Sequence, residues 1–326
     1  MIIDSHAHLV PPSLLEEIRS RKHDFPSLEV TEDGDSLAFS FSGNTRTRPV
    51  AGFLSNVEKR LAWMDENGID RQVVGGWLDM FGNDLPAEEG AAWSRLINSH
   101  LHAAGQAHEG RFIPLATVPL QDGALAAEVL REAHAHGFRG AMIGTQPKGR
   151  GGVLDDPDLD PFWQAAHELG SALFIHPVFD AGDDRVKAYG MENAVGRITD
   201  TLIAVSRLIY SGKVERYPGA KFVIGIGGAA LPFVIGRLRR NYALAKDKLA
   251  DPDKALSMMY YDTLVHEPEA LRLLVDTVGP DRIMLGSDMP FPIGDPAPRE
   301  ILAAAGIEGD ARDRIESGTV TSLLNL

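Results

Sequence analysis

Four residues that could bind a metal ion lie at the ends of apolar, strand-like runs in this sequence. His6 and His8 end the run Met1-Ile2-Ile3-Asp4-Ser5-His6-Ala7-His8, where an i, i+2 spacing in a β-strand puts both imidazoles on one face. His176 ends a second apolar run and Asp288 ends a third. Three imidazoles and a carboxylate suit one divalent transition metal, zinc being the commonest, with a position left open for water. Such a metal would lower the pKa of that water towards about 7, from about 15.7 in bulk solution.

Each of these residues also has a structural explanation when it is taken alone. A histidine pair spaced i, i+2 occurs by chance on protein surfaces, and His176 could be a hydrogen-bonded strand-end histidine before Pro177. Asp288 could cap the following segment or form an Asx turn before Pro290. The metal hypothesis therefore rests on all four residues meeting at one place in the fold.

The elements that would bring them together follow a regular alternation. Eight apolar runs alternate with segments in which apolar residues recur at spacings of three and four, which predicts parallel strands covered by helices. Eight such units favour a closed (β/α)₈ barrel, a TIM barrel, whose chemistry sits at the carboxyl ends of the strands. The eight expected strands are 1–8, 71–78, 112–118, 140–144, 172–176, 221–228, 258–264 and 282–288. The clearest expected helices are 56–67, 87–108, 123–136, 160–169, 194–212 and 268–278.

One insertion interrupts the alternation after the first strand. Within residues 25–49, the alternating segment 36–41 follows Asp33-Gly34-Asp35, which predicts a small β-hairpin. Because no linker or low-complexity tract divides the chain, we expect residues 1–326 to form one barrel domain with the hairpin inserted at about 25–50.

Composition narrows the classes of function. The chain has 326 residues, 44% of them hydrophobic, and a formal net charge of −14 without a basic stripe, which argues against a nucleic-acid partner. Cysteine is absent, which excludes disulfides, thiolate metal sites and a cysteine nucleophile. No apolar run reaches the eighteen or so residues of a membrane span, and no signal-peptide pattern opens the chain. We therefore expect a cytoplasmic enzyme with no membrane partner.

Several motifs together resemble the amidohydrolase superfamily, and within it the branch of aminocarboxymuconate-semialdehyde decarboxylase. The most specific is Gly286-Ser287-Asp288-Met289-Pro290-Phe291-Pro292 near the end of the chain. The others lie at 4–8, 47–50, 80–82, 118–122, 175–177, 227–228, 232–233 and 236–237. The resemblance implies a barrel with one zinc ion on His6, His8, His176 and Asp288. It also implies non-oxidative decarboxylation of a conjugated carboxylic acid, and a homodimer.

Two arginines acquire a role only through this resemblance. Arg48 and Arg237 match family positions that hold substrate carboxylates, the second reaching in from a neighbouring subunit. A guanidinium offers paired donors in a fork that matches a carboxylate. Without the resemblance, Arg48 in a polar loop and Arg237 in a basic helical run would both be interpreted as solvated surface charges.

The sequence departs from the family pattern at the end of the sixth strand. The family carries a histidine there that acts as a base on the metal-bound water, whereas this chain has Ile226. Asp288 could serve as both ligand and base. His266, just past the seventh strand, is a second candidate, although a helix-start residue before Glu267-Pro268 is the more common explanation of such a histidine. Alternatively, the substrate needs no histidine base, or the chain binds ligand and turns over slowly, since loss of a general base typically costs roughly 10²–10⁴-fold in rate.

These observations predict a metal-dependent lyase that decarboxylates a small conjugated or aromatic carboxylic acid. The alternative is a metal-dependent hydrolase or hydratase acting on a related ring-cleavage product. A third possibility, a ligand-binding barrel without activity, is motivated by Ile226 but is opposed by the retained metal ligands.

Overall fold

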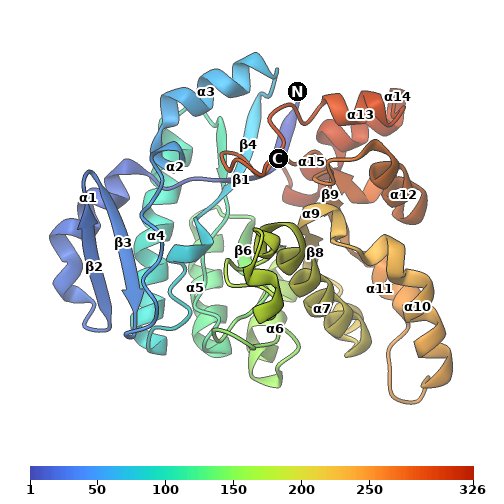
Figure 1. The fold of residues 1–326 in the computed structure, drawn as a ribbon, viewed down its shortest axis with the longest axis horizontal. Helices are drawn as coiled ribbons and strands as arrows, with labels where there is room; N and C mark the ends of the chain where they lie inside the picture. Colours follow the sequence, from blue (N-terminus) through green and yellow to red (C-terminus); the bar gives the residue numbers. More distant parts are fainter.

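Eight short parallel strands surround the centre of the molecule, in a computed structural model that describes residues 1–326 (Figure 1). All residues of β1, β6 and β7 are buried, as expected of strands that are covered on both faces. The strands are β1 Ile3–His8, β4 Arg71–Gly75, β5 Phe112–Pro114, β6 Gly140–Gly144, β7 Ala172–His176, β8 Lys221–Ile224, β9 Tyr260–Asp262 and β10 Ile283–Met284. Each one lies within one of the eight predicted runs.

The strands close into a barrel. They form two sheets, in the orders β1-β4-β5 and β10-β9-β8-β7-β6, and isolated parallel bridges join the sheets at Ala7–Met289 and at Ala116–Ala141. Backbone hydrogen bonds cross the same two seams: the Ser5 amide donates to the Leu285 carbonyl at 2.7 Å, and the Ala116 amide donates to the Gly140 carbonyl at 2.9 Å. The predicted (β/α)₈ architecture is therefore confirmed.

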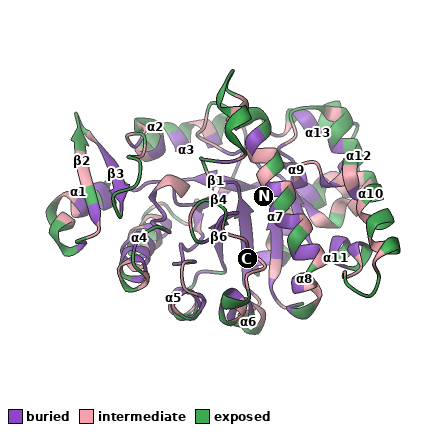
Figure 2. Cartoon of the chain, turned by 60° about the horizontal axis from the view of Figure 1, so that its bottom comes forward, coloured by how far each residue is buried: buried purple, intermediate pink, exposed green.

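Helices cover the outside of the barrel (Figure 1), and their outer faces carry the exposed residues while the strands within are buried (Figure 2). Their ends follow local signals: the Asp122 side chain accepts from the amides of Ala124 and Leu125 to cap α5, and Gly170 ends α6 with a left-handed φ of 64°. The longer helices are α1 Pro12–Arg21, α3 Val57–Glu66, α4 Ala87–Ala107, α5 Gly123–Ala135, α6 Asp160–Leu169, α7 Arg197–Tyr210, α10 Leu231–Leu244 and α12 Pro268–Val278. The shorter ones are α2 Gly52–Ser55, α8 Lys213–Arg216, α9 Gly225–Gly228, α11 Pro252–Met258, α13 Glu300–Ala304, α14 Gly309–Asp313 and α15 Thr319–Leu324.

The predicted hairpin is present after β1. Its strands, β2 Leu28–Asp33 and β3 Ser36–Phe41, pair in antiparallel register, and Gly34 adopts the positive φ of 58° that the tight turn requires. Phe39 and Phe41 of the hairpin lie against Trp93 of α4, with ring centroids 6.0 and 6.2 Å apart. The hairpin therefore packs beside the barrel, at the edge of the molecule next to α1 and α4 (Figure 1).

One apolar cluster of 68 buried residues, drawn from the hairpin, the barrel and the helices, forms the main core. That residues 1–326 form a single domain stays a prediction. Among the helices, none has the length and apolar character needed to cross a bilayer.

Candidate metal centre

The four predicted ligands meet at the carboxyl ends of the barrel strands. His6 and His8 end β1, His176 ends β7, and Asp288 follows β10 by four residues. One ligand atom from each residue lies within 4.8 Å of all the others. The Oδ1 atom of Asp288 is 3.6 Å from Nε2 of His6, 3.1 Å from Nε2 of His8 and 3.7 Å from Nε2 of His176. Side chains separated by 282 residues of sequence therefore converge on one small volume.

The second nitrogen of each imidazole, Nδ1, faces an oxygen acceptor. The three pairs are His6 with Asp262 Oδ2 at 2.6 Å, His8 with the Gly76 carbonyl at 3.0 Å, and His176 with the Pro177 carbonyl at 2.8 Å. A carbonyl can only accept, so Nδ1 of His8 and of His176 carries the proton and leaves Nε2 with a free lone pair. Nε2 of His6 is buried and has no hydrogen-bond partner. This is the arrangement of metal-binding histidines, and the four residues form a site for one divalent metal ion.

The charges of the cluster support the same assignment. Burial would raise the pKa of Asp288, but the neighbouring imidazoles of His176, His8 and His6 hold that pKa well below its usual range, so Asp288 is a carboxylate. Burial lowers the pKa of His176 to about 4, which keeps this imidazole neutral. Burial also acts to lower the pKa of His6, but the hydrogen bond and charge of Asp262, with the charges of Asp288 and Asp4, raise it to about 9. The site around His6 therefore favours a positive charge, which a metal cation would supply.

A buried polar network fixes the strand ends below the cluster. Asp4 accepts hydrogen bonds from the Gln72 side chain at 2.7 Å and from the Ser287 amide at 3.0 Å, which ties β1 to β4 and to the segment before Asp288. Arg60 of α3 donates to Gln72 at 2.6 Å and to the His8 carbonyl at 2.8 Å. Because these groups are buried and paired, they hold His6, His8 and Asp288 in one arrangement.

Asp262, the last residue of β9, belongs to the site although the sequence interpretation did not include it. Besides its contact with His6, it accepts hydrogen bonds from the backbone amides of Ile226 at 3.1 Å, Gly227 at 2.6 Å and Leu264 at 3.2 Å. A signal was present, because Asp262 is a carboxylate near the carboxyl end of the apolar run 258–264. It orients an imidazole rather than facing the other ligands.

Asp262→Asn should weaken metal binding by roughly 10–100-fold, because it removes the charged acceptor that orients His6. The expected result is a higher zinc dissociation constant in competition with a chromophoric chelator. Asp276→Asn, an exposed change on α12, is the matched control and should leave the constant unaltered. An unaltered constant in Asp262→Asn would show that the His6–Asp262 contact has no part in metal binding.

Ile226 lies beside this centre in an unusual backbone conformation. Its φ and ψ are 55° and 47°, the left-handed region that a β-branched residue rarely adopts. A Cβ atom placed on the preceding residue, Gly225, would lie 3.4 Å from Cε1 of His6, which locates this loop against the cluster. The loop that follows the sixth barrel strand, β8, therefore lies next to the metal ligands and holds Ile226 in a strained conformation.

The structure places Arg48 at the same mouth. Its guanidinium is 3.2 Å from Asp79, which follows β4, and its Cζ atom lies 3.8 Å from the centroid of the Phe179 ring, three residues after His176. Arg48 remains 51% exposed, so one side of this cation is open to a ligand.

The other two candidates do not join the cluster within one chain. Arg237 is exposed on α10 and makes no ion pair. His266 is exposed in the turn after β9, and no hydrogen bond or ion pair connects it to His6, His8, His176 or Asp288. The roles of Arg237 and His266 stay predictions.

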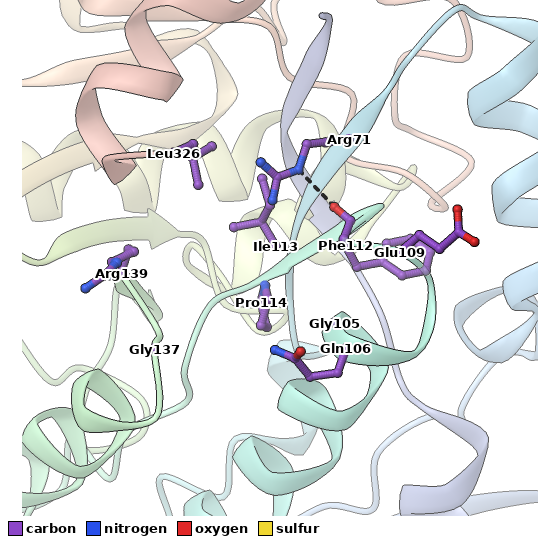
Figure 3. A pocket seen from close by; sticks show the side chains of 11 residues that line it. Arg71, Gly105, Gln106, Glu109, Phe112, Ile113, Pro114, Gly137, Arg139 and Leu326 are labelled. Carbon is purple, nitrogen blue, oxygen red and sulfur yellow. Dashed lines mark hydrogen bonds between the residues drawn. The ribbon is translucent and has the colours of Figure 1, made fainter.

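A separate hollow of about 410 Å³ lies at the opposite end of the barrel (Figure 3). Arg71 and Phe112, the first residues of β4 and β5, line it together with Arg139, which precedes β6. Because barrel enzymes place their chemistry at the carboxyl ends of the strands, this hollow is not the reaction site.

Comparison with known proteins agrees with the geometry. Residues 3–319 match the family described as Amidohydrolase. The 2-amino-3-carboxymuconate-6-semialdehyde decarboxylase of Dictyostelium discoideum is 30% identical over 249 residues, which are 74% of this chain and 69% of that protein. The gamma-resorcylate decarboxylase of a Polaromonas species is 28% identical over 255 residues, 72% of this chain and 77% of that protein.

A solved structure covers the whole chain. The 5-carboxyvanillate decarboxylase of Sphingomonas paucimobilis superimposes with a TM-score of 0.82 at 26% identity, over 100% of this chain and 99% of that one. The similarity therefore includes the barrel, the inserted hairpin region and the segments that carry the four ligands.

Proposed function

The chain belongs to the amidohydrolase family, and from that premise we propose that it is a metal-dependent decarboxylase of a small conjugated or aromatic carboxylic acid. The observation that carries the proposal is the convergence of three Nε2 atoms on one carboxylate oxygen. The carbonyls of Gly76 and Pro177 and the carboxylate of Asp262 orient the three rings through their Nδ1 atoms. The named relatives act on acids of this kind, and the reaction is a carbon–carbon bond cleavage that needs no oxidant.

His6, His8, His176 and Asp288 would hold the metal, and we propose zinc, since three nitrogens and one carboxylate oxygen are ligands that zinc accepts. When bound, a divalent ion supplies Lewis-acid chemistry, because it stabilises negative charge that develops on the substrate. The chain's own part is to hold the three Nε2 atoms and the charged carboxylate of Asp288 around one position.

The reaction requires one proton for the carbon that loses its carboxylate. The C–C bond to the carboxylate breaks, carbon dioxide leaves, the electron pair stays on the substrate carbon and a proton is added there. Asp288 is a charged carboxylate in the resting site, so it can accept a proton at a carboxylate oxygen and pass it to that carbon. His266, exposed at the turn after β9, is the second candidate for this proton transfer.

Arg48 would bind a substrate carboxylate. Its guanidinium is anchored on one side by Asp79 and rests over Phe179, while half of it stays open. Charge-assisted, paired hydrogen bonds from such a fork fix the orientation of a carboxylate as well as its position.

Arg237 would complete the site of a neighbouring subunit in a homodimer. On α10 it lies four residues after Phe233, whose side chain is 83% exposed, so a cation and an apolar ring share one unpartnered helix face. A location in the cytoplasm stays a prediction.

Carbon dioxide release tests the proposal. The zinc-loaded protein is incubated with a panel of hydroxybenzoic, carboxyvanillic and muconate-type acids in deuterium oxide. The expected result is release of carbon dioxide from at least one acid, with one deuterium at the carbon that lost the carboxylate. Incorporation of oxygen-18 from labelled water without carbon dioxide release would contradict decarboxylation and indicate the hydrolase or hydratase alternative.

A further inference from the structure

Arg197, the first residue of α7, is a half-buried cation without a partner. Its side chain makes no hydrogen bond and no ion pair, and its Nε atom is buried and unsatisfied. Arg60 is the useful contrast, because it is buried too but donates both to Gln72 and to the His8 carbonyl. A buried N–H donor without an acceptor is costly, so we expect Arg197 to have a partner that is not part of the chain.

The surroundings of Arg197 place it at the metal centre. Its Cζ atom lies 5.4 Å from the centroid of the Phe179 ring, and Arg48 approaches the same ring at 3.8 Å. Burial lowers the pKa of Arg197, and the charges that oppose this effect are led by Asp288, followed by Asp79. The same metal-ligating carboxylate therefore acts on Arg197, although it lies outside ion-pair distance.

Arg197 has no carboxylate within ion-pair distance. Asp79 is 8% exposed and forms its ion pair with Arg48 alone, while Asp288 and Glu192 act on Arg197 only through their charges. Contact with the Phe179 ring satisfies the face of a guanidinium but not its N–H donors, which lie in the guanidinium plane. What is missing is a planar acceptor with two oxygens.

We propose that Arg197 binds a second carboxylate of the substrate, so that the enzyme selects a conjugated or aromatic dicarboxylate over the matching monocarboxylate. The inference rests on the proposed function and names its substrate class. The guanidinium groups of Arg48 and Arg197 both lie near the Phe179 ring, beside the metal ligands. They would then bind the two carboxylates of one planar molecule within a single chain.

Ligand binding without turnover tests this assignment. Isothermal titration calorimetry on the zinc-loaded protein compares isophthalate with benzoate, which share a ring and differ by one carboxylate. We expect isophthalate to bind more tightly to the wild-type protein. Arg197→Met should weaken isophthalate roughly 10–100-fold, the effect of losing a charge-assisted hydrogen-bonded pair, and leave benzoate within about twofold. Arg197→Lys should recover part of the loss, because it keeps the charge without the fork.

Arg207→Met is the matched control, since Arg207 lies on the same helix but pairs with Asp155 outside the site. It should keep the preference for isophthalate. The assignment is overturned if wild-type protein binds both ligands equally, or if Arg197→Met weakens both to the same extent or neither. Thermal unfolding of each variant verifies that it is folded.

The two proposals fail separately. A preference for isophthalate that depends on Arg197, in a protein that releases carbon dioxide from no acid, contradicts decarboxylation only. Carbon dioxide release with equal rates for Arg197→Met and wild type on dicarboxylates contradicts the role of Arg197 only.

Discussion

Replacement of Asp288 by asparagine is expected to lower kcat for decarboxylation by roughly 10²–10⁴-fold. The change removes the one negative charge that faces all three Nε2 atoms, at 3.1–3.7 Å, and with it the group that can accept a proton beside the substrate. Asparagine keeps the size of the side chain, so the fold should tolerate it. The measurement is kcat with the metal content determined on the same sample, so that loss of metal and loss of chemistry are separated.

Asp276→Asn again provides the control, because it makes the same chemical change at an exposed, unpaired position on α12. Its kcat should equal that of the wild-type protein. A kcat within threefold of wild type for Asp288→Asn at full metal occupancy would remove Asp288 from the proton transfer and leave His266 as the candidate.

Ile226→His should raise kcat for decarboxylation by about 10²-fold or more on acids of the kind that the relatives use. The amide of Ile226 is held by Asp262 and the preceding residue, Gly225, lies against His6, so an imidazole at position 226 would be close to the metal ligands. Its left-handed backbone also suits histidine better than isoleucine. Steady-state kinetics on the acid panel measure the change.

Ile226→Asn separates the two effects of that substitution. Asparagine also accepts a left-handed backbone but cannot act as a base, so Ile226→Asn should be more stable than wild type in chemical denaturation without a gain in kcat. Equal gains in kcat from histidine and asparagine would show that relief of backbone strain, and not a restored base, accounts for the effect.

Sequence periodicity was sufficient to predict the barrel and the convergence of His6, His8, His176 and Asp288 at one mouth. His6, His8 and His176 end strands whose apolar runs are unambiguous, and parallel topology forces those ends to one mouth. Asp288 was predicted at the end of a strand spanning 282–288, whereas β10 ends at Met284. Asp288 still reaches the site because its amide donates to the His6 carbonyl at 2.8 Å, which extends the barrel seam beyond the strand itself.

The residues that support the ligands could not be found in this way. Asp262 contacts His6, 256 positions away, and Ile226, 36 positions away, while Arg197 lies near Phe179, 18 positions away, and neither residue belongs to a motif with its own spacing. The proposed role of Arg197 rests on its lack of a hydrogen-bond acceptor, and only the three-dimensional structure shows that lack. Ile226 was identified as a departure from the family pattern, but its left-handed backbone follows from the amides held by Asp262.

The most direct test of the metal centre is an anomalous difference map from crystals of the purified protein, recorded at the absorption edge of the metal it carries. The result expected is one peak per chain, at about 2.0–2.2 Å from Nε2 of His6, His8 and His176 and from a carboxylate oxygen of Asp288. A protein that is fully active while its map shows no peak among these four side chains would contradict the account.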